Sequence, residues 1–374
     1  MKVLIATGLY PPEIGGPATH IEILERELPA YGIDVVSAPF GVVRKYPKVL
    51  RHLLYSIQLF KKARGASLIY ALDPVSVGLP ASIVAWVLRK KFVLRIAGDY
   101  AWEQAVGRYG ATQFLDEFVH ETRKQPFMVR VLAHVERFVA CRADCVVVPS
   151  EYLKRIVSVW GVMPEKIHVV YNAFAPMHIT ETREAIRTMF GYTGTVIISA
   201  GRLVPWKGFD TLIAIVSALR KEGKDIMCVI VGDGPEKERL VARVKECEAE
   251  SYVRFVDRQP KETLATAIAG ADIFVLNTAY EGFSHQLLEV MAVGTPIVTT
   301  NVGGNGELLT HEETGLLVAY DDSEALKQMI RKIMEDEMLR ARLTQAARER
   351  AESFTLARMV HEVEEIFMQV VLTK

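Results

Sequence analysis

Residues 195–232 read TVIISAGRLVPWKGFDTLIAIVSALRKEGKDIMCVIVG. Two short apolar runs rich in β-branched residues, 195–201 and 226–232, enclose a helix-length segment at 208–223 that closes on a glycine. This order predicts a strand, a helix and a second strand. Such a unit is typical of a parallel sheet whose strands are joined by right-handed crossovers.

The same alternation continues in both directions along the chain. Buried strands are predicted at 2–7, 34–39, 67–72, 91–97 and 145–150, and again at 195–201, 226–232, 252–257, 272–277 and 296–300. We therefore expect an α/β protein with two doubly wound, Rossmann-like domains, 1–178 and 179–354, that face each other across a cleft. The irregular segment 172–185 marks the seam, and an amphipathic helix at about 355–374 crosses back to the first domain.

Composition and cysteine content indicate the compartment. Half of the 374 residues are apolar, and four cysteines are too few for a disulfide framework. The opening run at 2–7 fits a first strand better than a signal peptide, and the longest apolar segment, 77–88, is too short to span a bilayer. We expect a cytoplasmic protein that can lie peripherally at the inner membrane face.

Charge is unevenly distributed although the net charge is zero. Residues 1–175 contain 22 Lys and Arg against 15 Asp and Glu, and the remainder contains 23 against 30. The stretch from 35 to 72 has no acid and seven bases: Arg44, Lys45, Lys48, Arg51, Lys61, Lys62 and Arg64. This asymmetry indicates an anionic partner for the first half. We expect no nucleic-acid partner.

A helix is predicted at 47–65, inside this acid-free stretch. Its apolar residues share one face: Leu50, Leu53, Leu54, Ile57 and Phe60. Two readings remain open. Residues 44–64 can contact an anionic membrane as a basic amphipathic helix, or the helix can be an ordinary crossover whose apolar face packs on the sheet.

In a doubly wound sheet, ligands collect at the carboxyl ends of the strands. After the first predicted strand, Gly15 and Gly16 precede a helix, so the backbone there can approach a phosphate or a sugar closely. The loop is not G-x-G-x-x-G, and a simple glycine-containing loop is equally compatible with these residues.

Arg202 and Lys207 follow the first strand of the second half and precede a helix. Arginine is a planar fork and lysine a point charge, and two such cations suit a diphosphate. The alternative is a solvated loop.

The stretch YEGFSHQLLEVMA, residues 280–292, contains two glutamates. Glu281 follows a predicted strand, and Gly282, Phe283 and Ser284 bring backbone amides to the start of the next helix. Glu289 lies among apolar residues, where a carboxylate is costly unless it accepts hydrogen bonds. The Glu289 carboxylate can accept two hydrogen bonds from a diol, as acidic side chains do from ribose hydroxyls. A solvent-facing glutamate is the alternative.

Segments 201–213, 231–240 and 281–309 resemble the donor domain of the GT-B glycosyltransferases of family 4. The glycine loop at 15–16 and segment 146–174 resemble the same family, so the likeness runs through most of residues 1–320. Its most specific part is the E-x7-E element with an upstream Arg and Lys five positions apart.

The resemblance implies retaining transfer of a sugar from a nucleotide diphosphate sugar, of UDP or GDP type, to a glycan, lipid-linked or small-molecule acceptor. It implies no cofactor and no metal, and the sequence has no evident D-x-D motif. A nucleotide-sugar epimerase of the same fold, and a non-enzymatic two-lobed sugar-binding protein, are the alternatives.

The resemblance also implies roles for individual residues. Arg202 and Lys207 would bind the diphosphate, Glu281 the hydroxyls of the donor sugar, and Glu289 the ribose. The remaining donor-binding residues would be Gly15, Gly16, Val256, Arg258, Gly282, Phe283 and Ser284. Many relatives carry a histidine after the fourth strand, where this chain has Asp99. Either Asp99 takes over that catalytic contact or the donor sugar differs.

Overall fold

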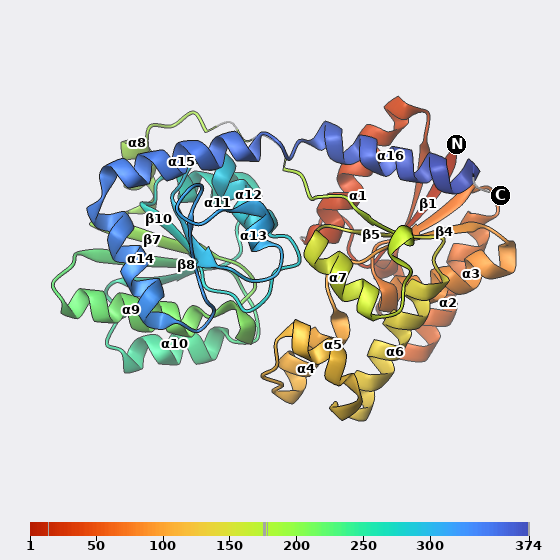
Figure 1. Ribbon diagram of the computed structural model, residues 1–374, viewed down its shortest axis with the longest axis horizontal. Coiled ribbons are helices and arrows are strands. Elements are labelled where there is room, and N and C mark those ends of the chain that lie inside the picture. The colour runs from red at the N-terminus through yellow and green to blue at the C-terminus, as the bar shows by residue number, and fades with distance from the viewer. Residues whose placement is uncertain (14, 175–176, 178, 373–374) are drawn as a thin grey trace. The chain divides into compact units, whose positions relative to one another are not determined.

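The structure, a computed structural model, describes residues 1–13, 15–174, 177 and 179–372. The chain divides into two compact units (Figure 1). Unit 1 comprises Met1–Asn172 and Leu356–Lys374, and unit 2 comprises Ala173–Thr355. The boundaries predicted from the sequence, 178/179 and 354/355, stay predictions, and residues 175, 176 and 178 of the predicted seam lie outside the described part.

Unit 1 is built on a six-stranded parallel sheet with strand order β2-β1-β3-β4-β5-β6. Its strands are β1 (Lys2–Thr7), β2 (Asp34–Pro39), β3 (Leu68–Ala71), β4 (Lys91–Arg95), β5 (Cys145–Val148) and β6 (Ile167–Val169). Its helices are α1 (Gly16–Glu27), α2 (Lys48–Ala63), α3 (Leu79–Leu88), α4 (Tyr100–Tyr109), α5 (Leu115–Glu121), α6 (Phe127–Arg142), α7 (Glu151–Val159) and α16 (Leu356–Leu372). The five strands predicted for this half are present, and β6 is an addition at the edge.

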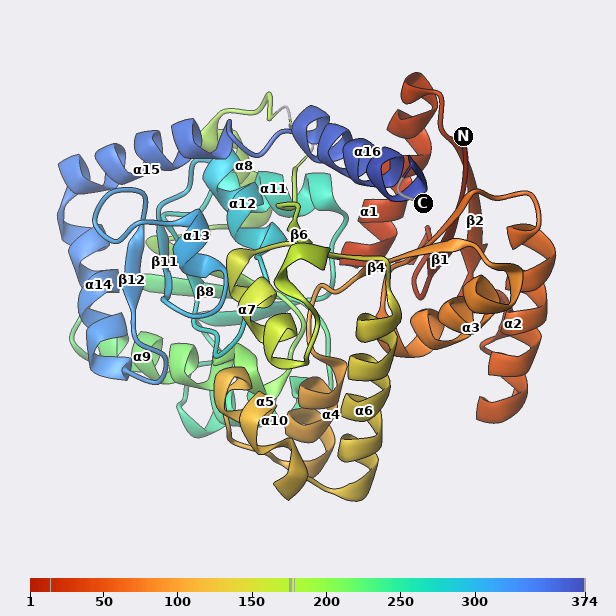
Figure 2. The ribbon, with the colours of Figure 1, turned by 45° about the vertical axis from the view of Figure 1, so that its right-hand side comes forward.

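The helices of unit 1 cover both faces of its sheet. Across the sheet, the chain moves in one direction from β1 to β2 and in the opposite direction from β2 through β5. Right-handed crossovers therefore place α1 on one face of the sheet and α2, α3 and α6 on the other. Helix α16 packs against α1, while α2, α3 and α6 lie side by side in that order (Figure 2).

The C-terminal helix belongs to unit 1, as the sequence predicts. Its apolar stripe is buried, and the ring of Phe367 packs edge-on against that of Tyr70 in β3, with ring centroids 5.1 Å apart. Burying such a stripe is what stabilises an amphipathic helix in water. Among the described helices, none combines the length and the apolar composition that crossing a bilayer requires.

The structure decides how α2 faces its sheet. Tyr55 and Leu59 are fully buried, and the Tyr55 hydroxyl donates to the carbonyl of Ala38 at 2.6 Å. Leu53 is 59% exposed, and Leu50 and Ile57 are exposed as well, with Leu54 and Phe60 half-buried. Helix α2 is thus the crossover between β2 and β3, but Tyr55 and Leu59 pack towards the sheet, and most of the apolar residues named from the sequence do not.

Unit 2 contains a second six-stranded parallel sheet, with order β12-β11-β10-β7-β8-β9. Its strands are β7 (Thr195–Ala200), β8 (Ile226–Val231), β9 (Val253–Val256), β10 (Ile273–Leu276), β11 (Ile297–Thr300) and β12 (Leu316–Val318). Its helices are α8 (Arg183–Phe190), α9 (Phe209–Lys221), α10 (Lys237–Glu246), α11 (Lys261–Ala269), α12 (His285–Val293), α13 (Asn305–Leu308), α14 (Ser323–Glu335) and α15 (Glu337–Ala351).

The central strands of unit 2 are buried along their whole length, as parallel strands covered by helices on both faces must be. This explains why β8 and β10 read as continuous apolar runs. Helix α9 ends at Gly223, whose φ of 84° is the left-handed conformation of a glycine cap. The two doubly wound sheets confirm the predicted fold class, and β12 adds a short edge strand.

Candidate functional site

The strand order of unit 2 reverses between β7 and β10. The chain proceeds from β7 towards β8 on one side, whereas β10 pairs with β7 on the other, with Ile273 opposite Ile197. The loops that leave the carboxyl ends of these two neighbours diverge, and such a switch point is where open α/β sheets bind ligands. The loop after β7 carries Arg202 and Lys207, and the loop after β10 carries Glu281.

Lys207 and Glu281 form an ion pair between these loops. Their side chains are only 15% and 14% exposed. Backbone contacts hold the loops together, because the carbonyl of Trp206 accepts from the amide of Ala279 at 2.8 Å and from the Thr278 hydroxyl at 3.2 Å. The sequence analysis missed this pair, although opposite charges after adjacent strands were a usable signal.

Gly208 makes the close approach of the two loops possible. Its φ is 55°, and a Cβ atom there would lie 2.4 Å from the carbonyl oxygen of Asn277 at the end of β10. Any larger residue would push the loop carrying Lys207 away from the loop carrying Glu281.

Arg202 lies on the same edge of the sheet. Its guanidinium carbon is 5.3 Å from the ring centroid of the buried Trp206, a cation–π contact. The loop after β8 supports its neighbours, since the amide of Leu203 donates to the carbonyl of Asp233 at 2.9 Å. The segment 232–240 therefore also fixes the backbone next to Arg202.

The glycine loop after β11 supports Glu281. The amide of Gly304 donates to the Glu281 carbonyl at 2.9 Å. Gly303 has a φ of 56°, and a Cβ atom there would lie 2.0 Å from the same carbonyl oxygen. Loops from three strands, β7, β10 and β11, thus position one carboxylate.

Helix α12 begins directly after Gly282 and Phe283, with Ser284 as its N-cap. The Ser284 hydroxyl accepts from the amide of Leu287 at 3.3 Å, so the capping interaction occupies it. The ring of Phe283 packs against that of Phe354, with centroids 5.5 Å apart. These contacts fix the segment whose amides were expected to face a ligand at the positive helix end.

Glu289 lies in the second turn of α12, and its side chain is largely buried. Burial raises the pKa of its carboxyl above the usual range, and nearby Lys261, 3.9 Å away, only partly offsets this. The carboxylate is therefore poised to gain from hydrogen-bond donors brought by a ligand. At the end of β9, Val256 is half-buried and Arg258 is exposed.

Three candidate residues belong to unit 1. Gly15 is the N-cap of α1 and Gly16 its first residue, as the sequence predicts. Asp99 is buried and caps α4, its carboxylate accepting from the amide of Trp102 at 2.7 Å. No observation places Asp99 against a sugar, so its catalytic role stays a prediction.

A second acid, Glu136 of α6, shares this helix end with Asp99. Its carboxylate accepts from the amides of Tyr100 at 2.7 Å and of Ala101 at 3.2 Å. Burial raises the pKa of Asp99 to about 6, and burial together with Asp99 raises that of Glu136 well above its usual range. Nothing in the sequence around Glu136 indicated this pairing, because the two acids are distant in the chain.

Within the described part of the chain, no three His, Cys, Asp or Glu side chains are grouped so that they could hold a metal ion.

Comparison with known proteins decides the family. A model of the "Glycosyl transferase 4-like domain" matches residues 3–173, and a model of "Glycosyl transferases group 1" matches residues 187–350. The chain belongs to the GT-B glycosyltransferases of family 4. This confirms the resemblance seen in the sequence.

Relatives of this glycosyltransferase act on different molecules. The D-inositol 3-phosphate glycosyltransferase of Jonesia denitrificans is 32% identical over 206 residues, which cover 51% of this chain and 49% of that protein. The match therefore spans about half of that relative's length. A glycogen synthase of Mycobacterium tuberculosis is 25% identical, covering 94% of this chain and 91% of that one.

Solved structures agree on the fold of this glycosyltransferase. HepE of Anabaena, in complex with UDP-glucose, superposes with a TM-score of 0.80 at 19% identity, covering 99% of this chain and 100% of the other. At this identity the likeness shows the GT-B fold and nothing finer.

Proposed function

We propose that this glycosyltransferase moves a sugar from a nucleotide diphosphate sugar, of UDP or GDP type, to a glycan, lipid-linked or small-molecule acceptor. Transfer would retain the anomeric configuration and need neither metal nor cofactor. The observation that carries the proposal is the Lys207–Glu281 pair beside Arg202, at the switch point of the unit 2 sheet. The HepE complex with UDP-glucose supports a nucleotide sugar as the donor.

The chemistry follows from this charge arrangement. The bond between the sugar's anomeric carbon and the diphosphate oxygen breaks, and a bond from the acceptor oxygen to that carbon forms on the same face. The acceptor's proton passes to an oxygen of the departing diphosphate. Arg202 and Lys207 stabilise the negative charge that develops there, and fixed cations in a partly buried site are effective for this.

Lys207 and Glu281 would exchange partners when the donor binds. In the structure each side chain neutralises the other in a site largely shielded from water. A diphosphate offers Lys207 a more highly charged partner, and the sugar hydroxyls offer Glu281 hydrogen-bond donors. The ion pair thus keeps both groups in place at low cost until the donor arrives.

The rest of the donor would extend along the same sheet edge. Glu289 would accept hydrogen bonds from the ribose hydroxyls, because its carboxylate is largely buried and the nearby cation Lys261 lies 3.9 Å away. The base would lie by Val256 and Arg258 at the end of β9. The amides of 282–284 would bind phosphate or sugar oxygens at the start of α12.

Unit 1 would contribute Gly15 and Gly16 at the N-terminus of α1, where backbone amides attract phosphate. Asp99 would act as a positioning residue for the turn between β4 and α4, since its carboxylate caps that helix. On the acceptor side, residues 44–64 would contact an anionic membrane, supported by the exposed leucines of α2.

The test is a panel of UDP-, GDP-, ADP- and dTDP-sugars incubated with the protein, with and without a metal chelator. We expect slow release of free nucleotide diphosphate from one or two donors, unaffected by the chelator, and a released sugar of unchanged anomeric configuration. Conversion of the donor to its epimer would favour the epimerase, and complete loss of activity with the chelator would overturn the metal-independent mechanism.

A further inference from the structure

Unit 1 exposes a broad apolar surface that begins at α2 and continues onto its neighbours. Helix α3 adds Ile83, Trp86 and Val87, of which Trp86 is 68% exposed. Helix α6 adds Phe127, which is 73% exposed, with Met128, Val131 and Phe138. Helices α2, α3 and α6 lie side by side on one face of the sheet (Figure 2), and we call the surface that carries these exposed side chains the three-helix face.

Unit 2 provides an internal comparison. It has a sheet of the same size with helices on both faces, yet its described residues expose only two large hydrophobic side chains, Met189 and Met338. A scattered apolar residue on a surface is ordinary, whereas a contiguous group of this kind marks an interaction site. The exposure in unit 1 is therefore not a general property of the fold.

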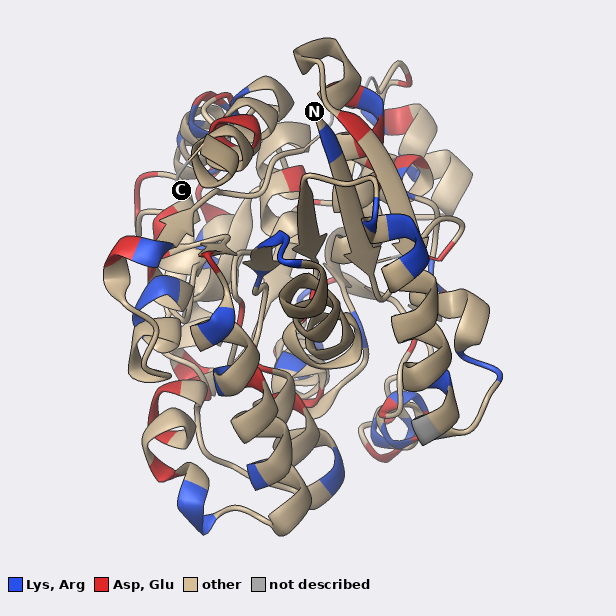
Figure 3. Ribbon diagram, turned by 90° about the vertical axis from the view of Figure 1, so that its right-hand side faces the viewer, with Lys and Arg blue, Asp and Glu red and all other residues tan. Residues whose placement is uncertain are grey.

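The three-helix face is positively charged. Helices α2 and α3 contain no Asp or Glu, and the single acid of α6, Glu136, is buried. Figure 3 shows blue segments and no red on the ribbon of α2. Exposed cations accompany the apolar side chains at or just beyond the helix ends: Lys61, Lys62, Arg64, Arg89 and Arg142. The side chain of Lys48, at the start of α2, lies outside the described part.

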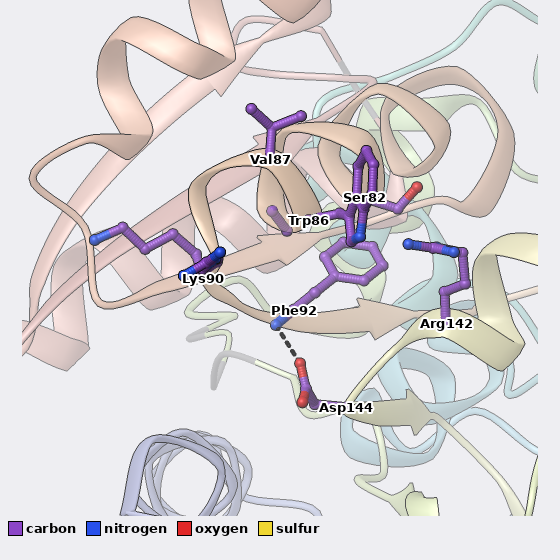
Figure 4. Close-up of a pocket in the computed structure, with 9 residues that line it drawn as sticks. Ser82, Trp86, Val87, Lys90, Phe92, Arg142 and Asp144 are labelled. Atoms are coloured by element: carbon purple, nitrogen blue, oxygen red, sulfur yellow. Dashed lines mark hydrogen bonds between the residues drawn. The ribbon is translucent and has the colours of Figure 1, made fainter. Parts of the chain in front are cut away.

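A pocket opens between α3 and the end of α6. Its volume is ≈ 620 Å³, and Arg89, Lys90 and Arg142 line it together with Trp86. Trp86 and Arg142 point toward one another, and the guanidinium carbon lies 5.9 Å from the indole centroid (Figure 4). The pocket thus combines an aromatic ring with three cations.

The one acid of the pocket, Asp144, is engaged elsewhere. Its carboxylate accepts from the amide of Phe92 at 2.8 Å and lies 3.6 Å from the ammonium of Lys91 (Figure 4). Cations at the C-terminal ends of α3 and α6 are also stabilised by the negative ends of the helix dipoles. That effect does not account for an exposed tryptophan beside them.

We propose that the three-helix face docks on an anionic lipid bilayer, with the pocket at Trp86 taking a lipid phosphate. Aromatic side chains favour the boundary between headgroups and acyl chains, and cations gain from anionic headgroups. A second copy that met this one through the same three-helix face would bring the same positive charge to the contact. Charge complementarity therefore favours the membrane as the occupant.

This inference concerns the acceptor side of the proposed function and rests on that function, because docking would give the enzyme access to a lipid-linked acceptor. Docking is measured without turnover, so the two can fail separately. Sedimentation with vesicles of phosphatidylcholine, alone or mixed equally with phosphatidylglycerol, is the assay. We expect binding to the anionic vesicles only, weakened at least about tenfold by high salt, which screens surface charges.

Two pairs of substitutions locate the contact. Trp86→Gln with Phe127→Gln, and Arg89→Glu with Arg142→Glu, should each lower vesicle affinity at least about tenfold. All four side chains are exposed and none is part of the donor site, so donor hydrolysis without lipid should not change. Matched controls in unit 2, Met338→Gln and Lys245→Glu, replace exposed side chains of the same kinds and should leave both measurements unchanged.

Two results would overturn the inference. One is the absence of binding to anionic vesicles at low salt by a protein that hydrolyses its donor normally. The other is a dimer in solution that Trp86→Gln with Phe127→Gln dissociates, which would make the three-helix face an interface between copies. Loss of donor hydrolysis with intact vesicle binding would instead count against the proposed function alone.

Discussion

The ammonium of Lys207, after β7, pairs with the carboxylate of Glu281, after β10. The two residues stand at the carboxyl ends of adjacent parallel strands, where the chain direction through the sheet reverses. The fold therefore delivers two opposite charges to one point from distant parts of the sequence. In a glycosyltransferase this point is suited to a donor that carries both a diphosphate and sugar hydroxyls.

The two glutamates of the E-x7-E element should have separable roles. Glu289→Gln should weaken nucleotide diphosphate binding by about 10- to 100-fold, because it removes charge-assisted hydrogen bonds to the ribose. Glu281→Gln should spare or improve that affinity, because it frees Lys207 for the diphosphate, while turnover falls on the order of 100-fold. Calorimetry with the free nucleotide, followed by donor hydrolysis, measures both. An equal loss of nucleotide affinity in the two variants would contradict this division.

Nucleotide binding should depend on pH through Glu289. Burial raises the pKa of its carboxyl, so the group becomes protonated at a higher pH than an ordinary glutamate does. We expect nucleotide affinity to fall as the pH is lowered into the mildly acidic range, and Glu289→Gln to remove much of that dependence. A variant whose affinity follows pH as steeply as the wild type would show that another group titrates.

Asp99 should make stability decrease as the pH rises. Burial raises its pKa to about 6, so between its unfolded and folded pKa values the native chain binds more protons than the unfolded chain. The contribution of Asp99 to stability is then fully present below about pH 4 and is lost as the pH rises through about 6. Asp99→Asn keeps a capping side chain but does not titrate, so it should gain on the order of 2 kcal/mol relative to wild type across this range.

Thermal unfolding at a series of pH values measures this effect, with the exposed acid Glu117→Gln as a control. Parallel curves for wild type and Asp99→Asn would refute the assignment. The same variant examines the catalytic prediction for Asp99: unchanged donor hydrolysis is expected of a helix cap, and a large loss is expected of a sugar ligand.

Gly303 should be essential for the position of Glu281. An alanine Cβ there would lie 2.0 Å from the Glu281 carbonyl oxygen, in a backbone conformation with φ of 56°. Gly303→Ala should cost about 1–3 kcal/mol of stability and lower turnover by displacing Glu281. Gly223→Ala is the matched control, because its φ of 84° is also positive but no atom lies within 4 Å of the added Cβ. Equal turnover in the two variants would show that the glycine loop does not position Glu281.

The local sequence pattern predicted the main strands and the candidate loops, but not the contacts between residues that are distant in the chain. The ten predicted strands are present because parallel strands buried on both faces leave unbroken apolar runs. The edge strands β6 and β12 were missed because each has only three residues and pairs on one side. Glycines and charges after the strands identified the candidate loops, since a doubly wound sheet fixes where its carboxyl ends lie.

Contacts between distant residues could not be read from spacing. The partner of Lys207 and the second acid beside Asp99 come from other strands and helices. The orientation of α2 was also undetermined, because the helix carries apolar residues on both faces; among its described side chains, the fully buried ones are Tyr55, Leu59 and Ala63. Periodicity shows that a face is apolar, but not which of two apolar faces is buried.

The turnover of Lys207→Ala and Arg202→Ala with the preferred donor measures whether these two cations stabilise the departing diphosphate. Loss of a cation that stabilises the departing diphosphate should raise the barrier by about 2–4 kcal/mol, which is roughly 30- to 1000-fold in rate. Lys224→Ala, which breaks an ion pair with Glu335 in the same unit, is the control and should keep the wild-type rate. Both variants should show this loss with an unchanged melting transition. Near-normal rates in both, with intact folding, would contradict the assignment of the diphosphate to these two residues.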